Sequence, residues 1–299
     1  MDRGGIPAIV FLILYFALCS WVSSLLLSKQ VSWRSRYTSI FIHTTLRLAA
    51  QICGIGYAVA GVEHSNWLVA YFVFGAEGYF TLVWCAFRFL ISFQNEVTGN
   101  SWIEPKREGM SWSEYYRKMP HYPVLYFHYS LAGANALIIV GSLKGMNTDL
   151  SDPSRASEIH TGVILRDVGT ALFMAWVLVL GYFCFRSYKY AQTRNQTRFL
   201  FIIGATVIPL LVRGVYGILA CEITQWNYAL PESYDSQGLK PGALAAEYLL
   251  GTTMEWSTCL LLLCTSFISL DNGRSQGSSL LNEKVNSKDK TQQDVHSVA

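Results

Sequence analysis

Charged and strongly polar side chains occur inside stretches of this sequence that are otherwise apolar. His43, Arg47 and Gln51 follow one another at intervals of four residues, so on a helix they share one face. Glu247 and Glu255 lie eight residues apart in the last apolar stretch. An ionisable group at membrane depth costs about 2.5 kcal/mol or more, so each one needs a partner or a function. These positions are therefore the first candidates for a functional site.

Two further charged residues, Glu77 and Arg213, are expected at a similar depth. The pattern predicts that Arg213 pairs with Glu77 or Glu255, and that Arg47 pairs with Glu255. One interpretation is that such pairs only fix how the helices pack. The number of charges favours the other interpretation, a polar interior that binds the head group of a ligand or passes a proton. The candidate ligand or proton site consists of Arg47, Gln51, Glu77, Arg213, Glu247 and Glu255.

The composition indicates which elements must hold these residues. Hydrophobic residues make up 52% of the 299 positions and charged residues only 14%, whereas soluble proteins average about 25% charged residues. The net charge of +3 gives no indication of a nucleic-acid partner. Residues 1–270 are predicted to form an all-α, polytopic bundle of seven transmembrane helices. The expected spans are 6–27, 38–62, 67–93, 124–145, 161–185, 198–221 and 244–269, each near the roughly 20 residues that a bilayer requires.

The distribution of Lys and Arg predicts how the spans are oriented. Fifteen of these residues follow the first, third, fifth and seventh spans, and four lie on the opposite side. Because positive loops stay in the cytoplasm, the N-terminus is predicted outside and the C-terminus cytoplasmic, in the plasma membrane or a secretory-pathway membrane. The glycosylation sequon Asn195-Gln196-Thr197 is then cytoplasmic. The polar segment 271–299 is predicted to be a disordered cytoplasmic tail.

Local signals predict three further features. Ser111 and Glu114 have the spacing of a capping box, which predicts a short helix lying on the inner membrane surface. Pro209 is expected to kink the sixth span. Arg166 and Asp167 are adjacent and cannot both face the interior, so Asp167 is predicted to line the outer mouth and Arg166 to extend toward the interface.

The sequence lacks the residues that several known classes of membrane protein require. No span contains a lysine for a retinal Schiff base, and the last span has neither the histidines of a membrane zinc hydrolase nor the proline of rhodopsin-like receptors. His43 and His128 are expected at equal depth and could ligate a haem, but the outer half of the spans offers no matching pair. We therefore predict no enzymatic activity, no cofactor and no metal.

Some motifs resemble those of fungal membrane proteins. Span six contains Val-Arg-x-x-Tyr over 212–216, span two contains Leu46-Arg47, and span seven is acidic. In these features the chain is similar to an uncharacterised fungal seven-transmembrane family. It resembles more distantly the RTA-like lipid-translocating exporters, whose span six reads Arg-x-x-Tyr/Phe-Arg-x-x-Glu. Gly217 and Ala220 replace the second arginine and the glutamate of that pattern, with Glu222 two residues later. The resemblance implies a fungal membrane protein with a polar interior.

Two functions remain as the main predictions. The first is a non-enzymatic transporter or lipid-handling protein, with membrane lipids and a small amphipathic or anionic ligand as partners. The alternative is a seven-helix receptor or sensor that is not of the rhodopsin type. A membrane enzyme or redox protein and a purely structural role are further alternatives. A transporter requires a cavity that opens alternately to each face, whereas a receptor requires an outer pocket that is closed below.

Overall fold

The computed structural model describes residues 2–61, 64, 66–105, 111–145, 155–228, 230–235 and 237–270. The predicted tail at 271–299 and part of the loop after the third expected span lie outside these residues.

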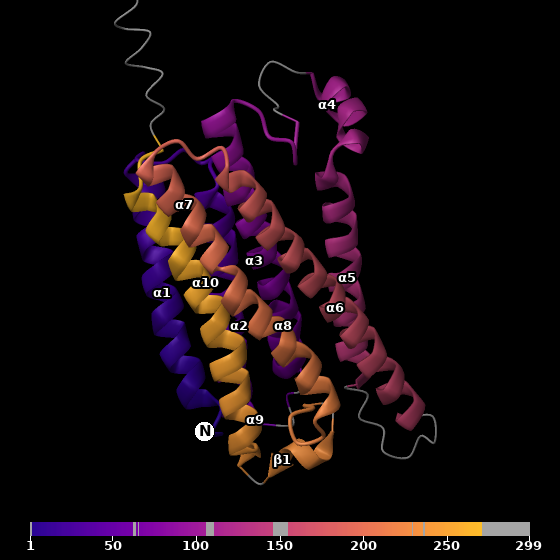
Figure 1. Cartoon of the computed structure of the whole chain (residues 1–299). Coiled ribbons are helices and arrows are strands. Elements are labelled where there is room, and N and C mark those ends of the chain that lie inside the picture. The colour runs from indigo at the N-terminus through magenta and orange to yellow at the C-terminus, as the bar shows by residue number, and fades with distance from the viewer. Residues whose placement is uncertain are drawn as a thin grey trace, which may run out of the picture.

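Most of the described chain is helical (Figure 1). The long helices begin and end within a few residues of the expected spans, and several extend further because a helix can continue beyond the apolar stretch that predicts it. Their bounds are α1 Gly5–Leu27, α2 Tyr37–Ala60, α3 Asn66–Thr98, α5 Pro123–Gly145, α6 Arg155–Tyr188, α7 Arg194–Ala205 and α8 Val207–Glu222, followed by α9 Pro241–Ala246, the π-helix η4 Glu247–Thr252 and α10 Thr253–Cys264.

Within the described residues, five helical segments are long and apolar enough to cross a membrane. They are Gly5–Leu27, Asn66–Thr98, Pro123–Lys144, Ala156–Tyr188 and Arg194–Glu222. Helix α2 has 24 residues, but its polar positions lower its mean hydropathy. The last stretch is divided between α9, η4 and α10, so none of its parts reaches membrane length alone. These two segments are the ones that carry most of the candidate site.

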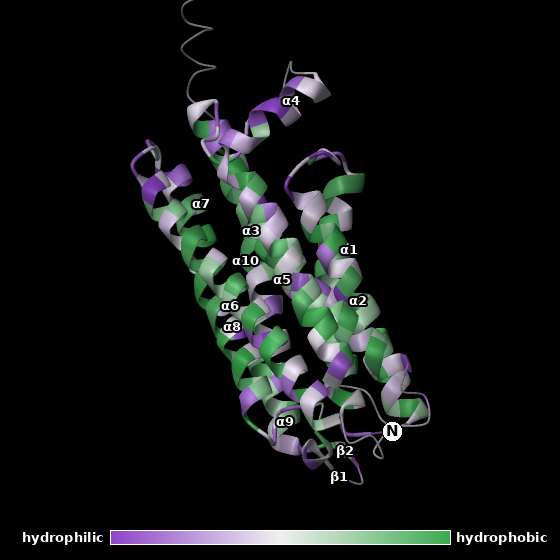
Figure 2. Cartoon of the chain, turned by 90° about the vertical axis from the view of Figure 1, so that its right-hand side faces the viewer, coloured by the Kyte–Doolittle hydropathy of each residue, from purple (hydrophilic) through white to green (hydrophobic). Residues whose placement is uncertain are grey.

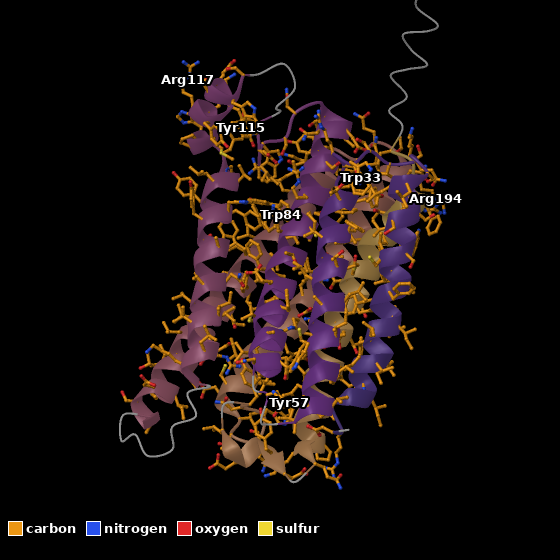
Figure 3. The ribbon with its side chains drawn as sticks, turned by 180° about the vertical axis from the view of Figure 1, so that it is seen from behind. Trp33, Tyr57, Trp84, Tyr115, Arg117 and Arg194 are labelled. Carbon is orange, nitrogen blue, oxygen red and sulfur yellow. The ribbon has the colours of Figure 1, made fainter. Side chains whose placement is uncertain are left out.

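The long helices lie side by side and run alternately in opposite directions (Figure 1). Arg117 and Arg194 lie at one end of the bundle, here called the basic end, and Tyr57 lies toward the other (Figure 3). Helix α3 is the central element, because it contacts α2, α5, α6, α7 and α10. Its residues from Leu82 to Phe93 are largely buried and form much of the apolar core.

Short elements cover the two ends of the bundle. At the basic end, Ser111 accepts a hydrogen bond from the Glu114 amide at 3.3 Å and begins helix α4, Trp112–Lys118, which confirms the predicted capping residue. The 3-10 turn η2, Met119–His121, leads into α5. The opposite end, called the hairpin end, carries η3, Pro231–Ser233, and the antiparallel strands β1, Tyr234–Asp235, and β2, Gly238–Leu239.

Large apolar side chains cover much of the outer surface of the bundle. Hydrophobic residues run along the sides of the long helices, while hydrophilic residues gather at the ends (Figure 2). Exposed side chains on this surface include Ile6, Ile13, Phe16, Leu178, Phe185, Phe201 and Ile208. So much exposed apolar area is unfavourable in water, and with the five apolar helices it identifies a multi-helix integral membrane protein.

Candidate functional site

Three charged residues form an ion network in the interior of the bundle. Glu255 on α10 accepts a hydrogen bond from Nε of Arg213 on α8 at 2.7 Å. Its other carboxylate oxygen lies 3.1 Å from Nε of Arg47 on α2, an ion-pair distance at which the N–H does not point at the oxygen. The side chains of Arg47 and Glu255 are 3% and 1% exposed, and that of Arg213 is 16% exposed. One carboxylate therefore serves two buried arginines.

Aromatic rings and a close helix contact hold this network in place. The Arg47 guanidinium lies 5.6 Å from the ring of Tyr15, and the Arg213 guanidinium lies 5.3 Å from that of Tyr79. Gly78 on α3 leaves the space that the network occupies, because a Cβ atom there would come within 2.7 Å of the Arg47 side chain. The arginines are thus shielded by ring faces, which attract cations.

The helices that carry Arg213 and Glu255 are both irregular beside the network. The kink expected at Pro209 appears as an interruption, because α7 ends at Ala205 and α8 begins at Val207. Leu210, at the start of α8, receives a hydrogen bond on its carbonyl oxygen from the Tyr79 hydroxyl at 2.9 Å. Eight residues before Glu255, the last helix widens into the π-helix η4. Such interruptions concentrate at functional sites in membrane helices.

Glu247 lies one step closer to the hairpin end than the network. It accepts hydrogen bonds from the hydroxyls of Tyr216 at 2.7 Å and Tyr71 at 3.2 Å. No arginine lies within ion-pair distance of it among the described residues. Glu247 therefore carries a carboxylate that is held only by neutral donors.

Glu77 does not join the network, contrary to one of the two pairings that the sequence suggested for Arg213. Its carboxylate accepts a hydrogen bond from the amide of Asn135 on α5 at 2.7 Å. The reason is geometric: successive residues on a helix point about 100° apart, and the neighbouring Gly78 is the one that faces Arg47. Glu77 is thus an interhelical contact between α3 and α5.

Gln51 and the two histidines have different surroundings. Gln51 is fully buried, and neither its amide nitrogen nor its oxygen has a hydrogen-bond partner in the part of the chain that the structure describes. His43 is buried against Thr81, with Nδ1 3.0 Å from the hydroxyl. His128 is exposed and contacts the ring of Trp84, so it does not meet His43. These histidines do not form a shared ligand pair.

Arg166 is a site residue that the sequence interpretation missed. It was expected to extend toward the interface, but only 6% of it is exposed, and its guanidinium lies 4.2 Å from the ring of Tyr228. Asp167 is the less buried of the two. The spacing could have found it: Arg166 precedes Thr170, Phe173 and Val177 on one helical face, and the structure buries all three. No carboxylate among the described residues pairs with Arg166.

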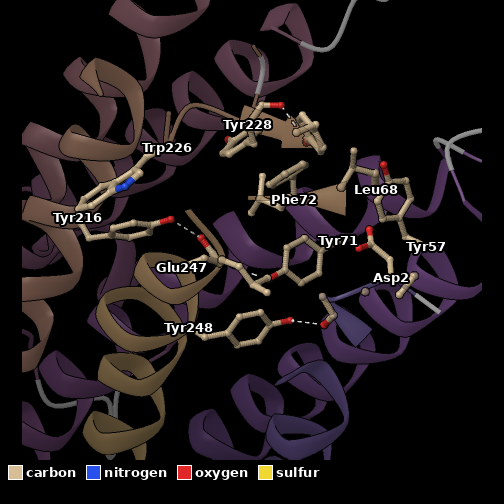
Figure 4. Close-up of a pocket in the computed structure, with 16 residues that line it drawn as sticks. Asp2, Tyr57, Leu68, Tyr71, Phe72, Tyr216, Trp226, Tyr228, Glu247 and Tyr248 are labelled. Carbon is tan, nitrogen blue, oxygen red and sulfur yellow. Dashed lines mark hydrogen bonds between the residues drawn. The ribbon is translucent and has the colours of Figure 1, made fainter. Parts of the chain in front are cut away.

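Two adjoining cavities lie between the ion network and the hairpin end. The first has a volume of about 70 Å³, and both Arg166 and Arg213 line it together with Glu247. The second, of about 80 Å³, is lined mostly by aromatic side chains, with the carboxylates of Asp2 and Glu247 among them (Figure 4). Tyr71, Phe72, Tyr216, Tyr228 and Glu247 line both cavities. We call the first the arginine cavity and the second the aromatic cavity.

The rim of the aromatic cavity is tied to the hairpin. The guanidinium of Arg3 lies 2.7 Å from the Asp235 carboxylate. The backbone N–H of Gln237 and the Arg3 guanidinium hold the pKa of Asp235 below its usual range. The start of α1 and the β1–β2 turn therefore close over the same end of the bundle.

A larger groove of about 1350 Å³ lies at the basic end. Trp33 and Tyr115 line it near the end of the bundle and Trp84 lines it deeper (Figure 3). Along α2, the groove ends near Ile42, the ion network lies at Arg47 and the aromatic cavity begins near Gly54. The network therefore separates the groove from the two cavities.

The described residues contain no group of three metal-ligating side chains. The arginines, carboxylates and aromatic faces of the site lie in a shielded interior, where they can recognise charged groups. Comparison with known protein families, characterised proteins and solved structures finds no match for this chain. The class of protein therefore follows from the fold and the site alone.

Proposed function

We propose that this chain is a seven-span membrane protein, with its N-terminus outside, that binds an amphipathic ligand through an anionic group and moves it as a non-enzymatic transporter or lipid-handling protein. The proposal counts α2 and the segment from α9 to α10 as spans. What supports this is that both run between the ends of the bundle alongside the five apolar helices (Figure 1). The basic end would face the cytoplasm, because most Lys and Arg are predicted there.

The observation that carries the proposal is the environment of Arg166. Arg166 is almost fully buried and has no carboxylate partner among the described residues, which is costly unless an anion reaches it. Arg166 and Arg213 line the arginine cavity together with Glu247, and Arg213 shares the Glu255 carboxylate with Arg47. These three arginines exceed the two carboxylates by one positive charge around a space that can hold a few atoms, which favours a bound anionic group.

The arrangement on either side of the ion network supports movement of the ligand. Cavities lie on the hairpin side and a groove on the basic side, with Arg47, Glu255 and Arg213 between them. The helices that carry Arg213 and Glu255 are the two that are interrupted. Interrupted helices beside a charged midplane site are how many transporters bind and release substrates.

Native mass spectrometry of the protein in mild detergent tests the binding step. We expect an amphiphile that contains an anionic group to be retained by the parent protein and by Arg198→Gln, a control that removes an exposed arginine outside the cavities. Arg166→Gln should lose the bound species. Equal retention by Arg166→Gln and the parent would contradict the proposal.

A receptor is the second candidate, and the large groove at the basic end is the observation that favours it. The groove lies on the other side of the ion network from the cavities, and it has the size to accept a segment of a partner protein. Proteoliposomes that contain an acyl-chain-labelled phospholipid distinguish the two. If the protein is a transporter, the parent protein should move the labelled lipid between leaflets faster than the Arg166→Gln variant does. If it is a receptor, the parent protein should bind the labelled lipid without moving it.

A further inference from the structure

We propose that the ligand is a zwitterion, with its anionic group in the arginine cavity and its ammonium group in the aromatic cavity. This rests on the proposed function, because the arginine cavity is the same site. It adds the chemical class of the second end of the ligand.

The aromatic cavity has the composition of a cation site. Eight aromatic side chains line it: Tyr57, Tyr71, Phe72, Tyr216, Trp226, Tyr228, Tyr234 and Tyr248. The faces of such rings attract ammonium groups, and cages of this kind recognise quaternary ammonium ligands. Aromatic rings alone would equally suit a neutral apolar group. The charged residues of the cavity therefore determine whether it favours a cation.

Two carboxylates give the aromatic cavity its sign. Glu247 is held by two tyrosine hydroxyls, and no cation neutralises it at ion-pair distance among the described residues. In Figure 4 the Asp2 carboxylate lies between the rings of Tyr57 and Tyr71, and its buried Oδ1 atom has no hydrogen-bond partner among the described residues. None of the described residues that line this cavity is a Lys or an Arg. An ammonium group is the ligand that satisfies both the rings and the carboxylates.

The two cavities adjoin, because Tyr71, Phe72, Tyr216, Tyr228 and Glu247 line both of them. One small molecule that passes these residues can therefore reach both cavities. The Phe72 and Tyr228 rings stack at 3.8 Å along this shared lining, and Tyr216 donates its hydrogen bond to Glu247 there. The Arg166 guanidinium contacts the Tyr228 ring from the arginine cavity. Gly217 keeps the arginine cavity open, because a Cβ atom there would meet Thr170 at 3.0 Å and Arg213 at 3.6 Å.

The volumes limit what fits. About 70 and 80 Å³ each correspond to roughly five to eight water molecules, at the 10–15 Å³ that one water requires. Each cavity therefore accepts one compact ionic group rather than a whole lipid. A phosphate joined by a short linker to an ammonium has this form, either as the head group of a lipid or as a soluble molecule.

Binding of four probes to the full chain in detergent tests the inference. Three carry the same acyl or alkyl chain length: a lysophosphatidylcholine, a lysophosphatidic acid and an alkyltrimethylammonium. The fourth is glycerophosphocholine, which has the zwitterion without a chain. Quenching of the fluorescence of Trp226, which lines the aromatic cavity, reports occupancy, with a Trp226→Phe variant to identify its signal.

We expect lysophosphatidylcholine to bind at least about tenfold more tightly than lysophosphatidic acid or the alkyltrimethylammonium, each of which carries charge of one sign only. Glu247→Gln should weaken the binding of lysophosphatidylcholine and of the alkyltrimethylammonium, but the binding of lysophosphatidic acid should be unchanged or tighter. Arg166→Gln should weaken the binding of lysophosphatidylcholine and of lysophosphatidic acid, but not that of the alkyltrimethylammonium. Glu232→Gln, an exposed carboxylate outside both cavities, should change none of them. Asp2→Asn repeats the Glu247 test at a second carboxylate, in case Glu247→Gln fails to fold.

The outcomes separate this inference from the proposed function. Equal binding of lysophosphatidic acid and lysophosphatidylcholine, unaffected by Glu247→Gln and Asp2→Asn, overturns the zwitterion and leaves the anion site in place. No binding of any probe that carries a phosphate overturns both. Glycerophosphocholine binding as tightly as the lysolipid supports the zwitterion and identifies a soluble source, while much weaker binding identifies a lipid.

Discussion

Glu255 neutralises two arginines from different helices, and this unequal sharing determines how the interior responds to substitution. Loss of Arg213 leaves Glu255 paired with Arg47, whereas loss of the Glu255 charge leaves two buried guanidinium groups facing each other. The sequence predicted that Arg213 pairs with Glu77 or Glu255 and that Arg47 pairs with Glu255. The structure shows that the single carboxylate of Glu255 serves both arginines.

Glu255→Gln should therefore be the most destabilising single substitution in the network, by about 3–5 kcal/mol, because it leaves buried charge uncompensated. Arg213→Met should cost less, within the roughly 0.5–3 kcal/mol of ordinary substitutions. Thermal unfolding of the two variants in the same detergent gives the order. A lower transition temperature for Arg213→Met than for Glu255→Gln would show that the carboxylate is not shared as described.

Gly78→Ala tests the space that the network needs. The added methyl group would lie 2.7 Å from Cδ of Arg47 and 3.1 Å from the Glu255 carboxylate, so the ion pair must shift. We expect the free energy of unfolding to fall by about 1–3 kcal/mol, the usual cost of overpacking. Gly133→Ala on α5 is the matched control, because a Cβ atom there meets nothing within 4 Å. Equal stability of the two variants would mean that Gly78 does not limit the network.

At the scale of the elements, the π-helix η4 sets the angle between the two acidic residues of the last segment. A π-turn contains one more residue than an α-turn, so it rotates Glu247 relative to Glu255. In this arrangement Glu255 faces both arginines while Glu247 faces Tyr71 and Tyr216. The one segment thereby supplies a carboxylate to the network and another to the cavities.

Deletion of Leu249 should convert η4 into a regular α-helix. Leu249 is 60% exposed, so its removal takes little from the core. Glu247 should then turn by about 100° and leave Tyr216 and Tyr71, while Glu255 keeps its arginines. We expect the variant to reach the membrane and unfold near the parent temperature but to lose ligand retention in native mass spectrometry. Replacement of Leu249 by Ala, which keeps the π-turn, should retain the ligand.

At the scale of the whole molecule, the ends of the bundle differ in what they can do. The hairpin end closes over small cavities through Arg3 and Asp235, and the basic end opens into a wide groove. In the proposed orientation the hairpin end faces outside and the basic end faces the cytoplasm. A ligand would then enter at the hairpin end, and its release or the contact with a partner protein would take place at the basic end.

The orientation predicts that Asn195 carries no N-glycan in a eukaryotic host, because it lies in the first turn of α7 at the basic end. Glycosidase treatment should leave the mobility of the protein unchanged. An N-terminal extension with its own acceptor sequence provides the positive control, since it should be glycosylated if the N-terminus is outside. A glycan on Asn195, or none on the extension, would reverse the proposed topology.

The sequence by itself determined the elements and the identity of most charged groups in the interior. Apolar stretches bounded by polar residues predicted where the long helices begin and end to within a few residues, and Ser111 predicted the start of α4. It also placed Arg47, Arg213 and Glu255 at similar depth, because helical rise along a span converts residue number into depth. These properties depend on composition and local geometry, which a sequence contains.

Only the tertiary structure decided which of these groups meet. The rotation of each helix about its axis depends on packing with its neighbours, and a difference of one residue turns a side chain by about 100°. This is why Glu77 contacts Asn135 instead of Arg213, and why Arg166 lies in the interior instead of at the interface. The π-turn of η4 and the lining that the two cavities share likewise arise from contacts between segments far apart in the chain, which no local pattern specifies.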